Sequence, residues 1–111
     1  MPAPRQGEVY QWPARGSHPM GVKPHMWVVV SRDVFNQHSS HVLLCPLTSY
    51  PATPLDIPVQ ATPHNPLSHD SSLLPRMITP VLKDHLGPCV GRLPRTVISP
   101  VLDRLRMMIE A

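Results

Sequence analysis

The sequence predicts a small, mainly β domain of the α+β class, with one helix at its C-terminus. Three observations lead to this prediction. The 111 residues are the size of a single domain. The 16 prolines work against long helices, because proline lacks an N–H donor and clashes with the preceding turn. Short β-branched runs alternate with turns, and only the last segment has helical spacing. We therefore expect residues 1–111 to form one domain, with residues 1–6 as a flexible tail.

Strands are expected where β-branched and aromatic residues gather. The first is Glu8–Trp12. The second, Met26–Ser31, is apolar almost throughout, which indicates burial on both faces, as in a barrel or a tightly packed sheet. Pro75 and Pro80 limit the segment 72–81 to a sheet edge or to bulged positions, because proline cannot donate to a sheet. Further strands are predicted within residues 41–47, 55–59 and 87–93.

Polar and proline-rich segments join these strands. Pro13–Pro24 and Ala61–Ser71 are predicted to be loops, and Asp33–Ser40 a turn or connector. In the final segment, Ser99 can cap a helix and Pro100 suits its first position. The apolar residues of this helix share one face and are expected to pack on the sheet: Val101, Leu102, Leu105, Met108 and Ile109.

Several classes of protein are excluded by what the sequence lacks. It has no run of 18 apolar residues and no signal peptide, so we expect no membrane span and a cytoplasmic location. Nucleotide-hydrolase, esterase and metalloprotease motifs are absent.

Cys45 and Cys89 lie in apolar sequence and are interpreted as two buried small residues. We expect no cofactor and no metal site, because no cysteine pairs accompany the histidines: His38, His41, His64, His69 and His85.

Six short motifs follow one another along the chain: Gly7–Trp12, Pro13–His18, Lys23–Ser31, Arg32–Asn36, Pro46–Ser49 and Leu86–Leu93. In this order they resemble the motifs of the MazF/PemK/Kid family of bacterial toxin ribonucleases. The resemblance extends from about Gly7 to Ile109. It implies an SH3-like small β-barrel of short antiparallel strands with a C-terminal helix packed on it, usually as a homodimer. It also implies a type II toxin that inhibits growth by sequence-selective cleavage of single-stranded RNA and that a cognate antitoxin neutralises.

The resemblance also suggests where the chemistry lies. The family's catalytic threonine corresponds to Thr48, its catalytic arginine to Lys23, and the acidic residue of its first loop to His18. Metal-independent RNA cleavage needs a base, an acid and a group that holds the phosphate. We expect Lys23 and Thr48 to hold the phosphate and His18 or His25 to transfer protons. RNA contacts are expected from Arg15, Ser17, Ser49 and Arg76, and Arg92 and Arg95 could line the same groove.

Each of these residues also has a purely structural interpretation. Lys23 and the arginines can be solvated surface charges, because the net charge of only +3 is common in proteins that bind no nucleic acid. Thr48 can be a strand end, the histidines can be loop surface, and Trp27 is interpreted as a core residue rather than a stacking platform. Two other functions therefore stay open. One is a barrel that binds RNA or an antitoxin without cutting, and the other is a toxin that acts on a protein such as DNA gyrase.

Overall fold

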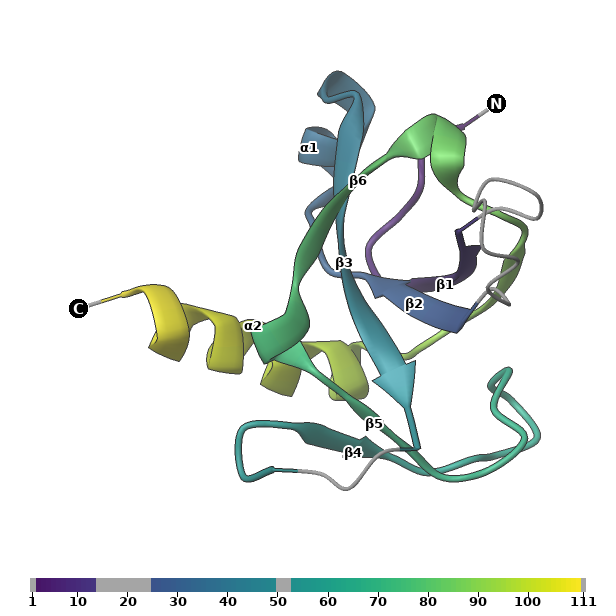
Figure 1. The fold of residues 1–111 in the computed structure, drawn as a ribbon, viewed down its shortest axis with the longest axis vertical. Helices are drawn as coiled ribbons and strands as arrows, with labels where there is room; N and C mark the ends of the chain where they lie inside the picture. The colour runs from purple at the N-terminus through teal and green to yellow at the C-terminus, as the bar shows by residue number, and fades with distance from the viewer. Residues whose placement is uncertain (1, 14–24, 50–52, 111) are drawn as a thin grey trace.

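The computed structural model describes residues 2–13, 25–49 and 53–110 (Figure 1). Strands and helices alternate as β1 (Glu8–Trp12), β2 (His25–Val29), α1 (Asp33–His38), β3 (His41–Thr48), β4 (Ile57–Val59), β5 (Ser71–Leu73), β6 (Thr79–Leu82), β7 (Cys89–Arg92) and α2 (Arg95–Ile109), with 3₁₀ turns at Pro75–Met77 and Lys83–His85. The predicted mainly β fold with a C-terminal helix is confirmed.

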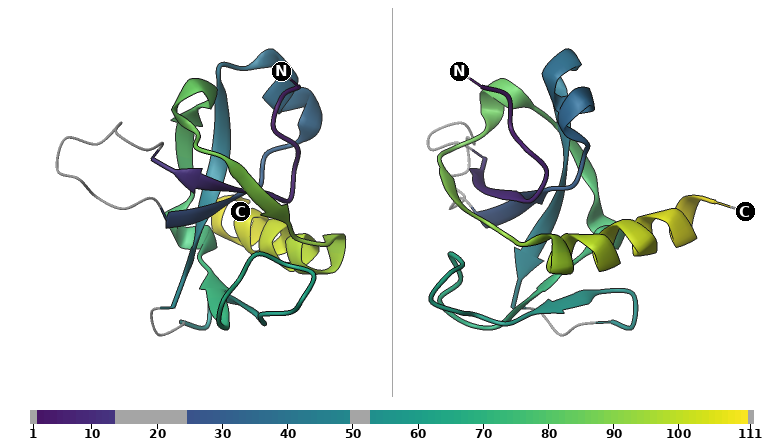
Figure 2. Two further views of the ribbon diagram at one scale, coloured as in Figure 1. Left: turned by 90° about the vertical axis from the view of Figure 1, so that its right-hand side faces the viewer. Right: turned by 180° about the vertical axis from the view of Figure 1, so that it is seen from behind.

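The strands form one antiparallel sheet that curls into a half-barrel. Their order is β4-β5-β3-β2-β1-β7, and β6 also pairs with β3. β3 is the longest strand, and it changes partner along its length. Leu44 pairs with Thr79 of β6, whereas Leu47 pairs with Leu73 of β5. The change of partner lets one strand hold two parts of a curled sheet together. Figure 2 shows α2 lying across this sheet beside the β4–β5 pair.

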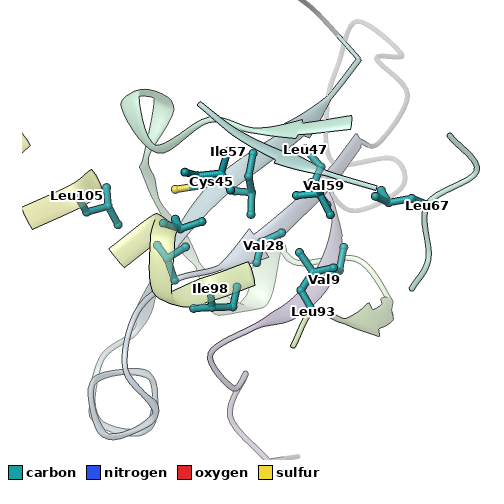
Figure 3. Close-up of a cluster of buried hydrophobic side chains, with 13 residues drawn as sticks. Val9, Val28, Cys45, Leu47, Ile57, Val59, Leu67, Leu93, Ile98 and Leu105 are labelled. Carbon is teal, nitrogen blue, oxygen red and sulfur yellow. The ribbon is translucent and has the colours of Figure 1, made fainter. Parts of the chain in front are cut away.

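The two faces of the sheet carry two apolar clusters. Val28 and Cys45 point into the larger cluster, which α2 covers (Figure 3). Val29 and Leu44, their immediate neighbours, belong to the smaller cluster. Successive side chains of a strand point to opposite faces, and all four of these side chains are fully buried. The prediction that the second strand is buried on both faces is therefore confirmed.

The C-terminal helix differs from the sequence prediction at both ends. It begins at Arg95 after Pro94, so Ser99 is not its cap and Pro100 lies inside it. Pro100 costs one backbone hydrogen bond near the helix start, but the earlier start brings Ile98 into the core, where it is 2% exposed. Met108 and Ile109 were expected on the buried face, yet both are exposed. Figure 1 shows the reason, because the end of α2 extends beyond the sheet.

A short helix, α1, replaces the connector expected at Asp33–Ser40, so that expectation is wrong. Its centre is the fully buried side chain of Asn36. The amide nitrogen Nδ2 donates to the carbonyl oxygens of Pro4 and Ser31, each at 3.0 Å. The Ser31 hydroxyl donates to Asn36 Oδ1, and Lys83 Nζ donates to the Asn36 carbonyl at 2.8 Å. The sequence of α1 has no apolar periodicity, so these hydrogen bonds account for the helix.

The N-terminal residues are held against the same helix, where composition suggested a flexible tail. The backbone N–H of Gln6 donates to Asp33 Oδ1 at 2.8 Å, and Gln6 Nε2 donates to the Val30 carbonyl at 2.7 Å. Arg5 Nε lies 3.5 Å from Asp33 Oδ2. Residues 4–6 thus join α1 to the end of β2. None of the helices in the described residues is long and apolar enough to cross a membrane.

The two cysteines have different environments, and both are free thiols. Cys45 is fully buried, and this burial raises the pKa of its thiol to about 12 because the thiolate would lose its hydration. Cys45 is therefore a packing residue and not a nucleophile. Cys89 is exposed. The prediction of two buried cysteines holds for Cys45 and is wrong for Cys89, which lies near one end of the sheet on β7.

The loop between β4 and β5 is ordered by its own polar side chains. Asn65 Oδ1 accepts hydrogen bonds from the N–H groups of Thr62 and Leu67. Asp70 Oδ1 accepts one from Ala61 at 2.7 Å. The loop also packs on β7, because Gly91 faces Pro66 so closely that an added Cβ would lie 2.9 Å from the proline Cδ. This contact requires glycine at position 91, and it fixes where the following loop residues lie.

Candidate active site

Three strand ends meet at one edge of the sheet. β2 begins at His25, β3 ends at Thr48 and β5 begins at Ser71. The strands are antiparallel, so the start of one strand lies beside the end of the next. Thr48 pairs with Ser72 of β5, and Trp27 pairs with Pro46 across β2 and β3. The start of β2, with His25, therefore lies at the same end of the sheet as the end of β3, with Thr48. Strand pairing thus brings a histidine and a hydroxyl from distant sequence positions to one end of the sheet.

A cavity of about 640 Å³ opens at these strand ends, and we call it the hydroxyl cavity. Three of the predicted site residues line it: His25, Thr48 and Ser49. Its other polar walls are Gln11, Ser68, His69 and Ser71, and its apolar walls are Met26, Trp27, Pro46, Leu47, Leu67, Leu74 and Met77. A lining that combines hydroxyl and imidazole groups with apolar surface suits a ligand with both polar and planar parts.

No carboxylate lines the hydroxyl cavity among the described residues. An anion therefore meets no repelling side chain from this part of the chain. The hydroxyls of Thr48, Ser49 and Ser71 can donate hydrogen bonds to phosphate oxygens. His25 and His69 come from separate segments, and an imidazole can both accept and donate a proton near neutral pH. The Ser68 hydroxyl oxygen lies 3.0 Å from His69 Nδ1, which restrains the orientation of that ring.

Trp27 forms part of the cavity wall and part of the smaller apolar cluster. Its ring meets that of Trp12 edge-on, with ring centres 5.0 Å apart and planes at 88°. The indole Nε1 is buried and has no hydrogen-bond partner within the part of the chain that the structure describes. The core interpretation of Trp27 is thus incomplete, because the same half-buried side chain also faces the cavity.

The other predicted site residues lie elsewhere. Arg15, Ser17, His18 and Lys23 fall outside the described residues. Arg76 Nε lies 3.3 Å from Oδ1 of the buried Asp56, and it is not among the residues that line the hydroxyl cavity. Arg92 and Arg95 line a different cavity. Of the four arginines expected around Thr48, three lie in the described residues, and none of these three lines the hydroxyl cavity.

The structure also adds residues that sequence reasoning did not assign to the site. His69 and Ser68 belong to the loop before β5, and Gln11 belongs to β1. The sequence predicted only a loop at Ala61–Ser71. The loop's return to the start of β2 depends on long-range packing, including the Gly91–Pro66 contact. No local signal in the sequence carries that information.

The fold and this cavity define a class: a small antiparallel half-barrel whose strand ends surround a cavity lined by hydroxyl and imidazole groups. Residues 5–109 match a family model described as PemK-like, MazF-like toxin of type II toxin-antitoxin system. Because the match covers nearly the whole sequence, the chain belongs to the MazF/PemK family of type II toxins, and the family predicted from the sequence is confirmed. A comparison with curated protein sequences finds no match.

Solved structures of the same fold support this assignment. An endoribonuclease in complex with its cognate antitoxin, from a mycobacterial species, has 25% identity and a TM-score of 0.72, and the match covers 96% of this chain and 93% of that one. The Mycobacterium tuberculosis toxin MazF-mt6 has 18% identity and a TM-score of 0.71, with 90% and 93% covered. A MazE-MazF structure from Deinococcus radiodurans has 17% identity and a TM-score of 0.73, with 97% and 96% covered. The last two are similar in fold alone.

Proposed function

We propose that this toxin is a sequence-selective endoribonuclease that cuts single-stranded RNA without a metal ion. The observation that carries the proposal is the placement of Thr48 and His25 in one cavity that no described carboxylate lines. A phosphodiester carries negative charge at every linkage, so a cavity of hydroxyls and imidazoles suits it better than one with acids. The similarity to a mycobacterial endoribonuclease supports the same class of reaction.

In the proposed reaction, the 2′-hydroxyl of the RNA attacks the adjacent phosphorus. A new bond forms between the 2′-oxygen and phosphorus, and the bond from phosphorus to the 5′-oxygen breaks. A base takes the proton from the 2′-hydroxyl, and an acid gives a proton to the departing 5′-oxygen. Thr48 donates a hydrogen bond to the phosphate, and the ammonium group of Lys23 stabilises its developing charge. The products are a cyclic phosphate and a free 5′-hydroxyl.

We assign the proton transfers to histidines. His25 lines the same cavity as Thr48. His69 lines the same cavity from the loop before β5, so two imidazoles can act on the two oxygens of one phosphate. His18 is the other candidate that the family resemblance gives. The RNA contacts expected of Arg15, Ser17 and Ser49 belong to the same proposal, whereas Arg76 is assigned a structural role through Asp56.

The partners of this toxin are proposed from the same family. We infer a cognate antitoxin that neutralises it and a homodimer as its working form. Solved structures of similar fold include an endoribonuclease with its cognate antitoxin and a MazE-MazF complex. The substitution of Lys23 for the family arginine removes the paired donors of a guanidinium. A toxin that binds RNA without cutting it is therefore the alternative that the experiment must separate.

The test is cleavage of a long mixed-sequence RNA in the presence of EDTA, with fragment ends mapped by sequencing. Wild-type protein is expected to give discrete cuts. Thr48→Ala and Lys23→Ala should each lower the cleavage rate about 10²-fold or more, and Thr48→Ser should restore part of the loss because it keeps the hydroxyl. A folded wild-type protein that binds RNA but cuts none would establish the binding alternative. Cuts that survive in both alanine variants would overturn the residue roles.

A further inference from the structure

We propose that this toxin also catalyses a second reaction, in which the cyclic phosphate end left by RNA cleavage is hydrolysed to a 3′-phosphate. The inference rests on the proposed function, because the product of the first reaction is the substrate of the second. That substrate can also be supplied ready-made, so the two proposals fail separately. The inference is carried by two imidazoles that share the hydroxyl cavity with Thr48, those of His25 and His69.

The strand order brings the two imidazoles in from opposite sides of Thr48. β3, which ends at Thr48, lies between β2 and β5 in the sheet. His25 begins β2, and His69 lies two residues before Ser71, where β5 begins. Neighbouring strands are ~5 Å apart, so the starts of β2 and β5 are about 10 Å apart across β3. A phosphate held by the Thr48 hydroxyl can therefore have one imidazole on each side.

RNA cleavage leaves these two imidazoles in exchanged protonation states. One of them takes the proton of the 2′-hydroxyl, and the other gives a proton to the departing 5′-oxygen. At the end of that reaction the first imidazole carries an extra proton and the second has lost one. Hydrolysis of the cyclic phosphate needs a base for the attacking water and an acid for the departing 2′-oxygen. The two imidazoles are then in the states that this hydrolysis requires.

The second reaction returns both imidazoles to their first states. Water enters where the 5′-oxygen has left, and the deprotonated imidazole removes one of its protons. A bond forms between the water oxygen and phosphorus, and the bond from phosphorus to the 2′-oxygen breaks. The protonated imidazole gives its proton to the 2′-oxygen. The product is a 3′-phosphate beside a free 2′-hydroxyl, and the reaction consumes only water.

Water can reach the phosphorus because both imidazoles lie at the surface. The side chains of His25 and His69 are exposed, whereas Thr48 is half-buried. The Ser68 hydroxyl oxygen lies 3.0 Å from His69 Nδ1, so we assign the proton transfer of His69 to its other ring nitrogen, Nε2. Departure of the 5′ fragment then opens the side of the phosphorus from which water attacks.

The hydroxyl cavity can hold the terminal nucleotide while this second reaction takes place. Its volume of about 640 Å³ lies within the range of small-molecule sites, roughly 300–1,000 Å³. The hydroxyls of Thr48, Ser49 and Ser71 can donate hydrogen bonds to the phosphate. Trp27 and the apolar wall offer the base a surface to pack on. Such retention matters because water must attack before the cyclic product dissociates.

The experiment gives the whole protein short RNA oligonucleotides of mixed sequence that already end in a 2′,3′-cyclic phosphate. The reaction runs with EDTA in water enriched in heavy oxygen, and mass spectrometry and phosphorus NMR follow the products. Wild-type protein is expected to place one heavy oxygen in each opened phosphate and to form only the 3′-phosphate. Uncatalysed hydrolysis opens the ring at either oxygen and therefore forms both isomers.

Variants of the exposed histidines connect this hydrolysis to the imidazoles. His25→Ala and His69→Ala should each lower its rate about 10²-fold or more. His69→Gln should be as slow as His69→Ala, because an amide can bond to the Ser68 hydroxyl but cannot transfer a proton. His64→Ala is the matched control, since His64 is exposed on the same loop but lines a second cavity, of about 1080 Å³. We call this second cavity the arginine cavity after the four arginines that line it: Arg32, Arg92, Arg95 and Arg106.

Three results would overturn the proposal. Cyclic ends that persist on prolonged incubation, whether supplied or newly cut, would remove the second reaction, and RNA cleavage would still stand as the proposed function. Equal losses in His64→Ala and His69→Ala would assign the effect to the loop rather than to the imidazole. A mixture of both phosphate isomers would show that no acid acts at the 2′-oxygen. Hydrolysis of supplied ends by protein that cuts no RNA would support the second reaction and overturn the first.

Discussion

The two ends of β2 carry different chemistry. At its start, His25 faces a cavity of hydroxyls and imidazoles, with no arginine among the described lining residues. Beyond its end lies a cavity with four arginines and an aliphatic floor. Arginine keeps its charge at every physiological pH, whereas histidine gains and loses a proton near neutrality. A strand of five residues thus separates groups suited to reaction from groups suited to holding a charged partner.

This difference teaches that the distribution of basic residues alone does not point to the candidate active site at Thr48. The basic residues of the described chain gather away from Thr48, although phosphate chemistry is expected there. Hydrogen-bond donors line the hydroxyl cavity, and no lysine or arginine does so among the described residues. Four of the described arginines instead line the cavity beyond the end of β2, which Thr48, His25 and His69 do not line. The following predictions test this division.

The largest effect is expected from the histidines of the hydroxyl cavity. His25→Ala and His69→Ala should each lower the single-turnover rate of RNA cleavage about 10²- to 10⁴-fold, because each removes a proton-transfer group. His38→Ala is the matched control, because His38 is exposed at the end of α1 and outside both cavities. Wild-type rates in both cavity variants would show that the reaction takes its protons elsewhere.

A smaller effect, on stability, is expected when the buried Asn36 of α1 is replaced. Asn36→Ala should reduce the free energy of unfolding by about 2–4 kcal/mol, because it leaves the buried carbonyls of Pro4 and Ser31 without a donor. Urea unfolding followed by tryptophan fluorescence measures this loss. Gln37→Ala is the control, since Gln37 is exposed on the same helix. Equal stability of the two variants would mean that α1 is held by other contacts.

The smallest effect concerns the sheet between the two cavities and depends on pH. The pKa of Cys45 rises from an ordinary 9.0 to about 12 on folding. Between these values the unfolded chain loses the proton first, so stability falls as the pH rises. The loss should reach about 1 kcal/mol near about pH 10. Cys45→Ala should remove the part of this decline that comes from the thiol, whereas Cys89→Ala, a change at an exposed thiol, should keep it. An unchanged slope in Cys45→Ala would show that the decline comes from other groups, such as Tyr10, whose pKa is also raised by burial.

The strands could be predicted because their signals are local. The apolar run at Met26–Ser31 required burial on both faces, and β2 has it. The small helix α1 could not be predicted, because its stabilising partner for Asn36 lies 32 residues away at Pro4. The true start of α2 depends on Ile98 reaching the core, which spacing from Val101 onward did not reveal.

The site divides in the same way. Thr48 and His25 could be named from motifs and residue chemistry, and strand register then brings them into one cavity. Arg76 was expected to contact RNA, but its partner is the buried Asp56, twenty residues earlier in the chain. His69 was considered only as a metal ligand, since nothing near it in the sequence shows that its loop returns to β2. Long-range partners decide each of these cases.

The contact of Gly91 with Pro66 has a consequence for how this sequence can diverge. Any side chain at position 91 would meet the rigid proline ring rather than a flexible side chain, so the loop would have to move. That loop carries His64 to the arginine cavity and His69 to the hydroxyl cavity. A single mutation away from glycine would therefore alter both cavities at once. Position 91 therefore couples the two cavities, and substitutions that change only one of them must come from other positions.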